Sequence, residues 1–221
     1  MRRNAVIFVA ISLLSGFGST AMSLVSGVWI LDLTGSSALA ALAGLCVYAP
    51  TLAGPWLGGL LDRVPRRPLV VAVNLSLAAA LLSLLAVRTA AHIWLIFAVS
   101  LAYGVSYVLV DAGETALLPA ALPPAALGDV NGWRSSAQEG MKLLAPAVGV
   151  GVYAWQGGHS VAVLSAAMPV LGAALYGALR LRHDRPGPVP RENRGPHAGL
   201  TVIRAEPAMR PPDSHLGPPT C

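Results

Sequence analysis

The sequence predicts an all-α membrane protein with six transmembrane helices. Of its 221 residues, 55% are hydrophobic and 11% are charged, whereas about a quarter of the residues of a soluble domain are charged. A bilayer-spanning helix needs about 20 apolar residues, and only a helix or a closed barrel satisfies the backbone in lipid. A barrel would alternate apolar and polar residues, which this chain does not. The apolar stretches are residues 4–31, 37–61, 68–87, 93–118, 133–155 and 160–181.

The first three spans are delimited by polar residues. Arg2 and Arg3 precede an apolar stretch that continues to about residue 31. The apolar region of a secretory signal has only about 7–15 residues, so this stretch is interpreted as a first membrane helix. The second span follows the segment "DLTGSS", and the third lies between "DRVPRR" and Arg88.

The fourth and fifth spans contain acidic residues in their interior. The fourth contains Asp111 and Glu114, which are three positions apart and therefore share one face of a helix. The fifth contains Glu139 and Lys142 at the same spacing, and Pro146, which we expect to bend this helix. The sixth is apolar along nearly its whole length.

Lysine and arginine residues predict the orientation, because cytoplasmic loops of membrane proteins carry an excess of them. With both termini inside, the N-terminus, the segment 62–67, the loop before the fifth span and the tail all lie in the cytoplasm. Arg88 then lies in an outer loop. The sequence thus predicts a multi-pass protein of the cell membrane with both termini cytoplasmic.

The composition changes at about residue 182. Residues 182–221 are polar and rich in proline, as is typical of flexible linkers and disordered tails. We therefore expect a six-span transmembrane domain, residues 1–181, and a disordered cytoplasmic linker or tail, residues 182–221.

Charge is concentrated in the segment "GGLLDRVPRRP" between the second and third spans. Gly58 is followed after three residues by Asp62 and Arg63, and then by Arg66 and Arg67. The glycine allows a neighbouring helix to approach closely. The aspartate can pair with an arginine or accept hydrogen bonds, and the arginines can bind anionic lipid. On the charges alone, a simple positive-inside anchor explains the segment.

The spacing of these residues resembles the loop motif of the major facilitator superfamily of transporters. That motif has glycine, three residues, aspartate, a basic residue, any residue, glycine and two basic residues. This chain has Pro65 in place of the second glycine. The resemblance implies half of a twelve-helix transporter fold, built from two three-helix repeats. It also implies a loop that latches the two halves together in one access state.

Two further segments are similar to the drug- and siderophore-exporter-like branch of this family. Residues 116–124 resemble the end of the fourth span in that branch. Residues 127–153 resemble the start of its fifth span, at Asn131, Arg134, Ala145, Pro146, Gly149 and Gly151. The analogy with this branch implies proton-coupled efflux of a small molecule by alternating access.

Ionisable residues inside membrane helices are candidates for function. Asp111 lies deep in its span and is the first candidate for proton or cation coupling, with Glu114 as the second. Arg134, Glu139 and Lys142 are candidates for intramembrane charge pairing. If the fourth and fifth spans touch, Glu114 could meet Arg134 or Lys142. The alternative is that charges near the cytoplasmic helix ends only neutralise one another.

The resemblance leaves part of the fold without a counterpart, because the family has two six-helix halves around a midplane site. Residues 198–212 resemble the lead-in to the second half, and the half itself does not follow. We therefore expect a truncated transporter, a chain that forms a homodimer, or one that pairs with a separate second half. An alternative of a different class is a non-transporting membrane protein that acts as an interaction or assembly module.

Other functional classes find no support in the sequence. The net charge of +5 comes largely from arginines at the ends of apolar stretches, not from a basic face with aromatic residues, so nucleic acid is not an expected partner. The chain shows no nucleophile–base pair, metal-ligand spacing or phosphate-binding loop. We expect no enzyme activity, metal or cofactor. The expected partners are the lipid bilayer and a small-molecule substrate of unassigned class.

Overall fold

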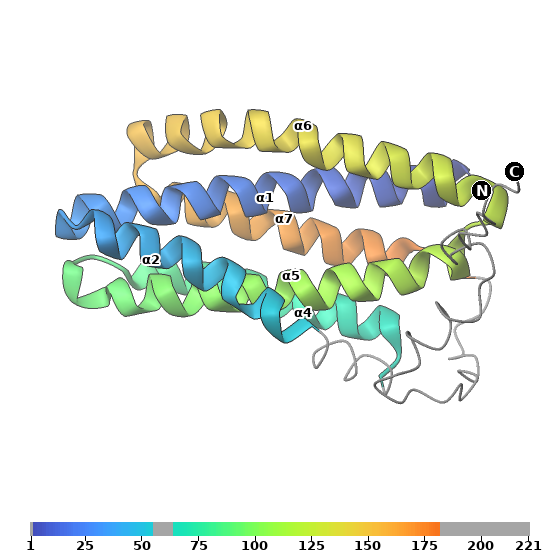
Figure 1. Ribbon diagram of the computed structural model, residues 1–221, viewed down its shortest axis with the longest axis horizontal. Helices are drawn as coiled ribbons and strands as arrows, with labels where there is room; N and C mark the ends of the chain where they lie inside the picture. The colour runs from blue at the N-terminus through green and yellow to red at the C-terminus, as the bar shows by residue number, and fades with distance from the viewer. Residues whose placement is uncertain (1, 55–63, 182–221) are drawn as a thin grey trace, which may run out of the picture. The chain divides into compact units, whose positions relative to one another are not determined.

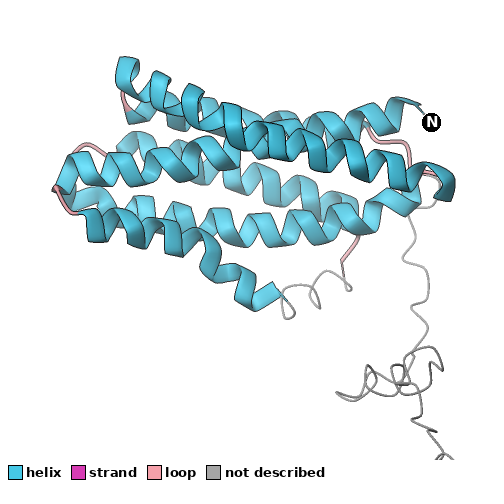
Figure 2. Cartoon of the chain, turned by 45° about the horizontal axis from the view of Figure 1, so that its top comes forward, coloured by secondary structure: helices cyan, strands magenta, loops and turns pink. Residues whose placement is uncertain are grey.

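The computed structural model describes residues 2–54 and 64–181, and every regular element in these ranges is a helix (Figure 1, Figure 2). The elements are α1 (Arg2–Thr34), α2 (Ser37–Tyr48), the short helix η1 (Ala49–Ala53), α4 (Arg66–Ser83), η2 (Leu84–Ala86), η3 (Ala90–His92), α5 (Ile93–Ala121), α6 (Pro124–Gln156) and α7 (Gly158–Ala178). The six α-helices correspond one to one to the six predicted spans, which confirms the predicted class. The predicted tail, residues 182–221, lies outside the described residues.

Four helical segments are long and apolar enough to cross a bilayer. They are Arg2–Thr34, Arg66–Ala86, Ala90–Ala121 and Gly158–Ala178. The segment Ser37–Ala53 is apolar but shorter, and the end of the predicted second span falls on residues outside the description. α6 has the necessary length, but it contains Asp129, Arg134, Glu139 and Lys142. These charges make α6 the helix least suited to lipid on all sides.

The start of α6 differs from the prediction. The predicted span begins at residue 133, whereas the helix begins at Pro124, and only Leu122 and Pro123 separate it from α5. Proline is well tolerated in the first turn of a helix, since its missing N–H needs no partner there. Ala125, Ala126 and Leu127 follow and are strong helix formers. The expected loop is therefore the beginning of the helix.

The packing of the helices has the symmetry of two three-helix repeats. α1 packs along α6 and α7, while α5 packs against α2 and α4, and α4 packs on α7. Exchanging α1, α2 and α4 with α5, α6 and α7 maps the first four of these contacts onto one another and the α4–α7 contact onto itself. This is the relation expected of the two repeats within one half of such a transporter.

Basic side chains hold one end of the bundle together. At this end α1, α4 and α6 begin and α5 and α7 end (Figure 1). Arg3 donates a hydrogen bond to the carbonyl of Ala178 (3.0 Å), and Arg67 donates from Nε to the carbonyl of Tyr176 (3.2 Å). Both guanidinium groups thus bind the C-terminal turn of α7, where they complement the helix dipole. We call this end of the bundle the basic end.

Asn4 adds a neutral link at the basic end. Its buried side-chain amide donates to the carbonyl of Ala121 at the end of α5 (3.0 Å) and to that of Arg180 just after α7 (2.9 Å). One side chain of α1 therefore joins the ends of two other helices.

Tight packing around Trp29 holds the opposite end. The indole of Trp29 stacks edge-on with the imidazole of His159, with ring centroids 5.2 Å apart. The Nε2 atom of His159 lies 2.7 Å from the carbonyl oxygen of Val87. A Cβ atom at Gly158 would lie 2.4 Å from the indole, so the absence of a side chain there lets α7 begin directly against α1.

Candidate substrate cavity and buried ion pair

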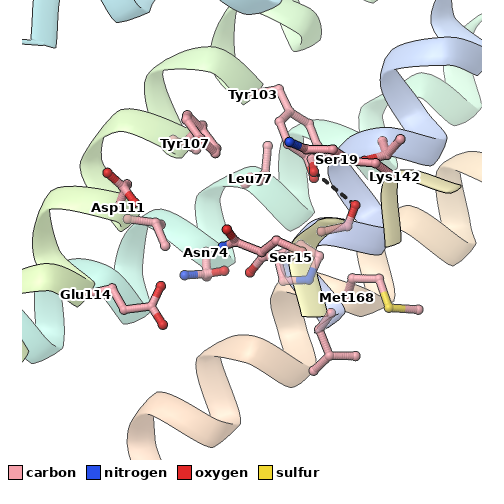
Figure 3. Close-up of a pocket in the computed structure, with 17 residues that line it drawn as sticks. Ser15, Ser19, Asn74, Leu77, Tyr103, Tyr107, Asp111, Glu114, Lys142 and Met168 are labelled. Atoms are coloured by element: carbon pink, nitrogen blue, oxygen red, sulfur yellow. Dashed lines mark hydrogen bonds between the residues drawn. The ribbon is translucent and has the colours of Figure 1, made fainter. Parts of the chain in front are cut away.

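A cavity of about 130 Å³ lies among five of the helices (Figure 3). Its lining combines hydroxyl, amide and charged side chains with apolar ones. The lining residues are Leu14, Ser15, Gly16, Ser19 and Thr20 of α1, Asn74 and Leu77 of α4, Tyr103, Ser106, Tyr107, Val110, Asp111 and Glu114 of α5, Gln138 and Lys142 of α6, and Met168 and Pro169 of α7. Such a mixture is typical of small-molecule sites.

One face of α5 supplies the most prominent polar groups of the cavity. Tyr103, Tyr107 and Asp111 are spaced by four residues, and Glu114 follows three residues later, so all four lie on the same side of the helix. Figure 3 shows them in succession along α5, with Asn74 of α4 close by. The predicted shared face of the two carboxylates is therefore present, and it borders the cavity.

Glu114 forms a buried ion pair with Arg134. The Nη2 atom of Arg134 lies 2.8 Å from Oε2 of Glu114, and the two side chains are only 11% and 5% exposed. Arg134 also donates to Oγ of Ser12 (3.3 Å) and to Oδ1 of Asn131 (3.0 Å). This network ties α1, α5 and α6 together. The two candidates from the sequence, Glu114 and Arg134, are thus brought into direct contact.

The second carboxylate oxygen of Glu114 is buried without a hydrogen-bond partner among the described residues. The same holds for the hydroxyl of Tyr176, which lies next to Glu114. Burying polar atoms in this way has a cost of about 1–3 kcal/mol each unless another group binds them. The Tyr176 hydroxyl beside Glu114 is the donor placed to satisfy this oxygen after a small change of geometry.

Glu139 and Lys142 pair with each other and not with α5. Their side chains lie 2.6 Å apart, three residues apart on α6, and both are mostly exposed. Lys142 also lines the cavity, where its charge is balanced by Glu139. Asp111 is exposed on the cavity wall and forms no ion pair with another described residue. It is therefore the uncompensated charge of the site.

Several lining residues were not among the sequence candidates. Ser15, Ser19 and Gln138 carry no charge, and such residues in membrane helices commonly serve packing. The signal that could have identified the two serines is the regular spacing of the serines along α1, which gives that helix one hydroxyl face. Within residues 2–54 and 64–181, no group of three His, Cys, Asp or Glu side chains could hold a metal ion.

Comparison with known proteins defines the family. The family model of the Major Facilitator Superfamily matches residues 5–212. This chain belongs to the major facilitator superfamily. No curated protein and no solved structure gave a significant match. Major facilitator proteins are multi-pass membrane proteins that act as secondary transporters and not as enzymes, so the cavity is a candidate site for a transported molecule.

The family loop motif is only partly described in this major facilitator protein. Gly58, Asp62 and Arg63 lie outside the described residues. Arg66 and Arg67 form the first turn of α4. Arg67 binds the end of α7, as noted above, and Nη1 of Arg66 lies 3.4 Å from a backbone carbonyl of α5. Both arginines thus have binding partners within the six-helix bundle itself.

Pro146 is the residue that the sequence predicted to bend the fifth span. It lies inside α6, which continues as one helix on both sides of it. The predicted bend at this residue stays a prediction. Ala145 and Gly149 next to it are buried, and a Cβ at Gly149 would come within 3.1 Å of Ala21, so this small-residue segment lets α6 pack closely on α1.

Proposed function

We propose that this major facilitator protein is one half of a secondary active transporter that exports a small molecule in exchange for protons by alternating access. The observation that carries the proposal is the position of Asp111, an unpaired carboxylate on the wall of a cavity bordered by five helices. A carboxylate can bind a proton or a cationic group, but not fully satisfy both at once. Competition between the proton and the substrate for one carboxylate is sufficient to couple proton movement to substrate movement.

Asp111 is a better candidate for coupling than Glu114. Arg134 already binds Glu114, and that pair is needed to hold three helices together. Asp111 has no such engagement with a described residue, and it faces the space that a substrate would occupy. A change in its charge therefore alters the cavity without removing a structural contact.

Replacing Asp111 with asparagine is expected to abolish proton coupling while leaving the bundle folded. The assay uses the purified chain in liposomes that contain a trapped pH-sensitive dye, with a panel of small organic compounds added outside. We expect saturable proton movement with one class of compound, and a reduction of roughly tenfold or more in Asp111→Asn, as for loss of an essential proton-transfer group. Asp129→Asn is the matched control, because Asp129 is an exposed carboxylate outside the cavity.

The second half of the transporter is part of this proposal. α5 and α6 expose Asp111, Glu139 and Lys142 on the bundle, and charged side chains that face lipid are costly, by about 2.5–3.5 kcal/mol each on insertion scales. We infer that a second six-helix half, either another copy of this chain or a separate protein, covers this face. Saturable proton movement by the chain alone would support a second copy. No movement by the chain alone, with stable insertion, would leave a separate half or a non-transporting assembly protein.

We also propose that the basic end faces the cytoplasm. Arg3, Arg66 and Arg67 gather at this end, whereas Arg88 lies between α4 and α5 at the other. In cells that express a variant with alanine in place of both native cysteines, a membrane-impermeant thiol reagent should label Arg88→Cys from outside. Exclusive labelling of Arg2→Cys from outside would show the opposite orientation.

A further inference from the structure

A row of serines runs along one face of α1. The residues are Ser12, Ser15, Ser19, Ser23 and Ser26, and their separations of three or four residues place them on the same side of the helix. At 1.5 Å per residue, the row extends about 21 Å along the axis. Its first member binds Arg134 of the buried ion pair. The row therefore leads from that pair toward the opposite end of the bundle.

A second, smaller cavity continues the main one along this row. Its volume is about 10 Å³, and it is lined by Ser19, Met22, Ser23 and Ser26 of α1, Val47 of α2, and Val99, Ser100 and Tyr103 of α5. Ser19 and Tyr103 line both cavities, and Figure 3 shows these two side chains next to each other. A space of about 10–15 Å³ is the minimum that one water molecule needs.

The polar groups in the smaller cavity favour water as its occupant. Ser26 and Ser100 are only 3% and 4% exposed, and neither hydroxyl forms a hydrogen bond with another described residue. A buried hydroxyl without a partner is unfavourable. The apolar lining residues cannot supply one, whereas a single water can donate to one serine and accept from the other.

We propose that bound water occupies both cavities and forms a chain along the serine face of α1, from the Glu114–Arg134 pair to Ser26 and Ser100. Protons reach or leave Asp111 along this chain, each water accepting one proton and passing on another. Tyr103 stands where the two cavities meet and is a positioning residue for the chain. The proton-carrying role rests on the proposed function, but the hydration of the path does not depend on it.

Exchange of a thiol proton tests the hydration. The background carries Cys46→Ala and Cys221→Ala, which removes both native cysteines. Ser26→Cys and Ser100→Cys probe the path, and Ser165→Cys is the matched control, since Ser165 is equally buried but lines neither cavity. In D₂O an S–H group exchanges to S–D where water reaches the sulfur, and loss of the S–H stretching band in the infrared spectrum measures the rate. We expect exchange at the two path positions to be roughly tenfold faster or more, because a dry site exchanges only when the structure opens locally. Equal rates at all three positions would overturn the hydrated path, whatever the transport activity.

A second pair of variants tests the proton-carrying role in the dye-loaded liposomes. Ser100→Val removes a hydroxyl from the path, whereas Ser165→Val removes one elsewhere. We expect several-fold slower proton movement in the first variant only. Fast thiol exchange combined with unchanged proton movement in Ser100→Val would overturn the proton-carrying role and leave the hydration standing. If the unmodified chain moves no protons, a transporter formed by two copies of this chain is ruled out, and the exchange rates still decide whether the path is hydrated.

Discussion

Replacing Arg134 with alanine is expected to lower the free energy of unfolding by about 3–5 kcal/mol, the cost of leaving one member of a buried ion pair without its partner. Glu114 would keep its negative charge in a site that is almost closed to solvent. Ser12 and Asn131 would lose hydrogen bonds in the same step, so that three helices lose their common link. Thermal unfolding of the detergent-solubilised protein, followed by loss of monodisperse material, measures this effect.

Two further variants separate the buried charge from the other contacts of Arg134. Lys142→Ala breaks an ion pair on the same helix that is mostly exposed, and such pairs contribute about 0–1 kcal/mol. Combining Glu114→Gln with Arg134→Gln removes both charges and should recover much of the stability that Arg134→Ala loses. If Arg134→Ala and Lys142→Ala were equally mild, burial of the Glu114 charge would not be the determining factor.

Replacing Gly104 with alanine is expected to separate α2 from α5. A Cβ at this position would lie 2.1 Å from the carbonyl oxygen of Val47 and 2.9 Å from Cγ of Pro50. The first of these atoms belongs to the backbone, so it cannot move without shifting α2. Overpacking of this kind costs about 1–3 kcal/mol and sometimes more. We expect a lower unfolding temperature and a lower yield of membrane-inserted protein.

Gly44→Ala is the control for this prediction. Gly44 lies in α2, and nothing approaches within 4 Å of a Cβ built there. Alanine is a better helix former than glycine by about 1 kcal/mol, so this variant should be neutral or slightly stabilised. Similar losses of stability in both variants would contradict the prediction, because they would show that the steric clash at Gly104 is not the cause.

The helices could be predicted well because lipid imposes one simple requirement on each of them. A span must be long, apolar and internally hydrogen-bonded, and α1, α4, α5 and α7 meet this requirement in their own sequences. The start of α6 could not be predicted in the same way. Its first turns extend beyond the apolar stretch, so their helical form depends on local propensity and on Pro124, which hydropathy does not register.

The site could be predicted only as far as single helices determine it. The shared face of Asp111 and Glu114 follows from their spacing alone. The choice of Arg134 over Lys142 as the partner of Glu114 depends on how α5 and α6 are placed against each other, which no local pattern encodes. The regular spacing of the serines on α1 can be read from the sequence. That these serines line the two cavities depends on how the other helices pack around α1, which the sequence alone does not give.

The links made by Asn4 and Arg3 have a consequence for the biogenesis of the protein. These side chains belong to the first helix that leaves the ribosome, but their partners at Ala121, Ala178 and Arg180 are synthesised much later. α1 also finds its main neighbours in α6 and α7. The contacts of the first helix with the last two therefore form only after the final span has been synthesised. Assembly of this domain is therefore complete only when α6 and α7 have packed onto α1, and stepwise addition of hairpins does not describe it.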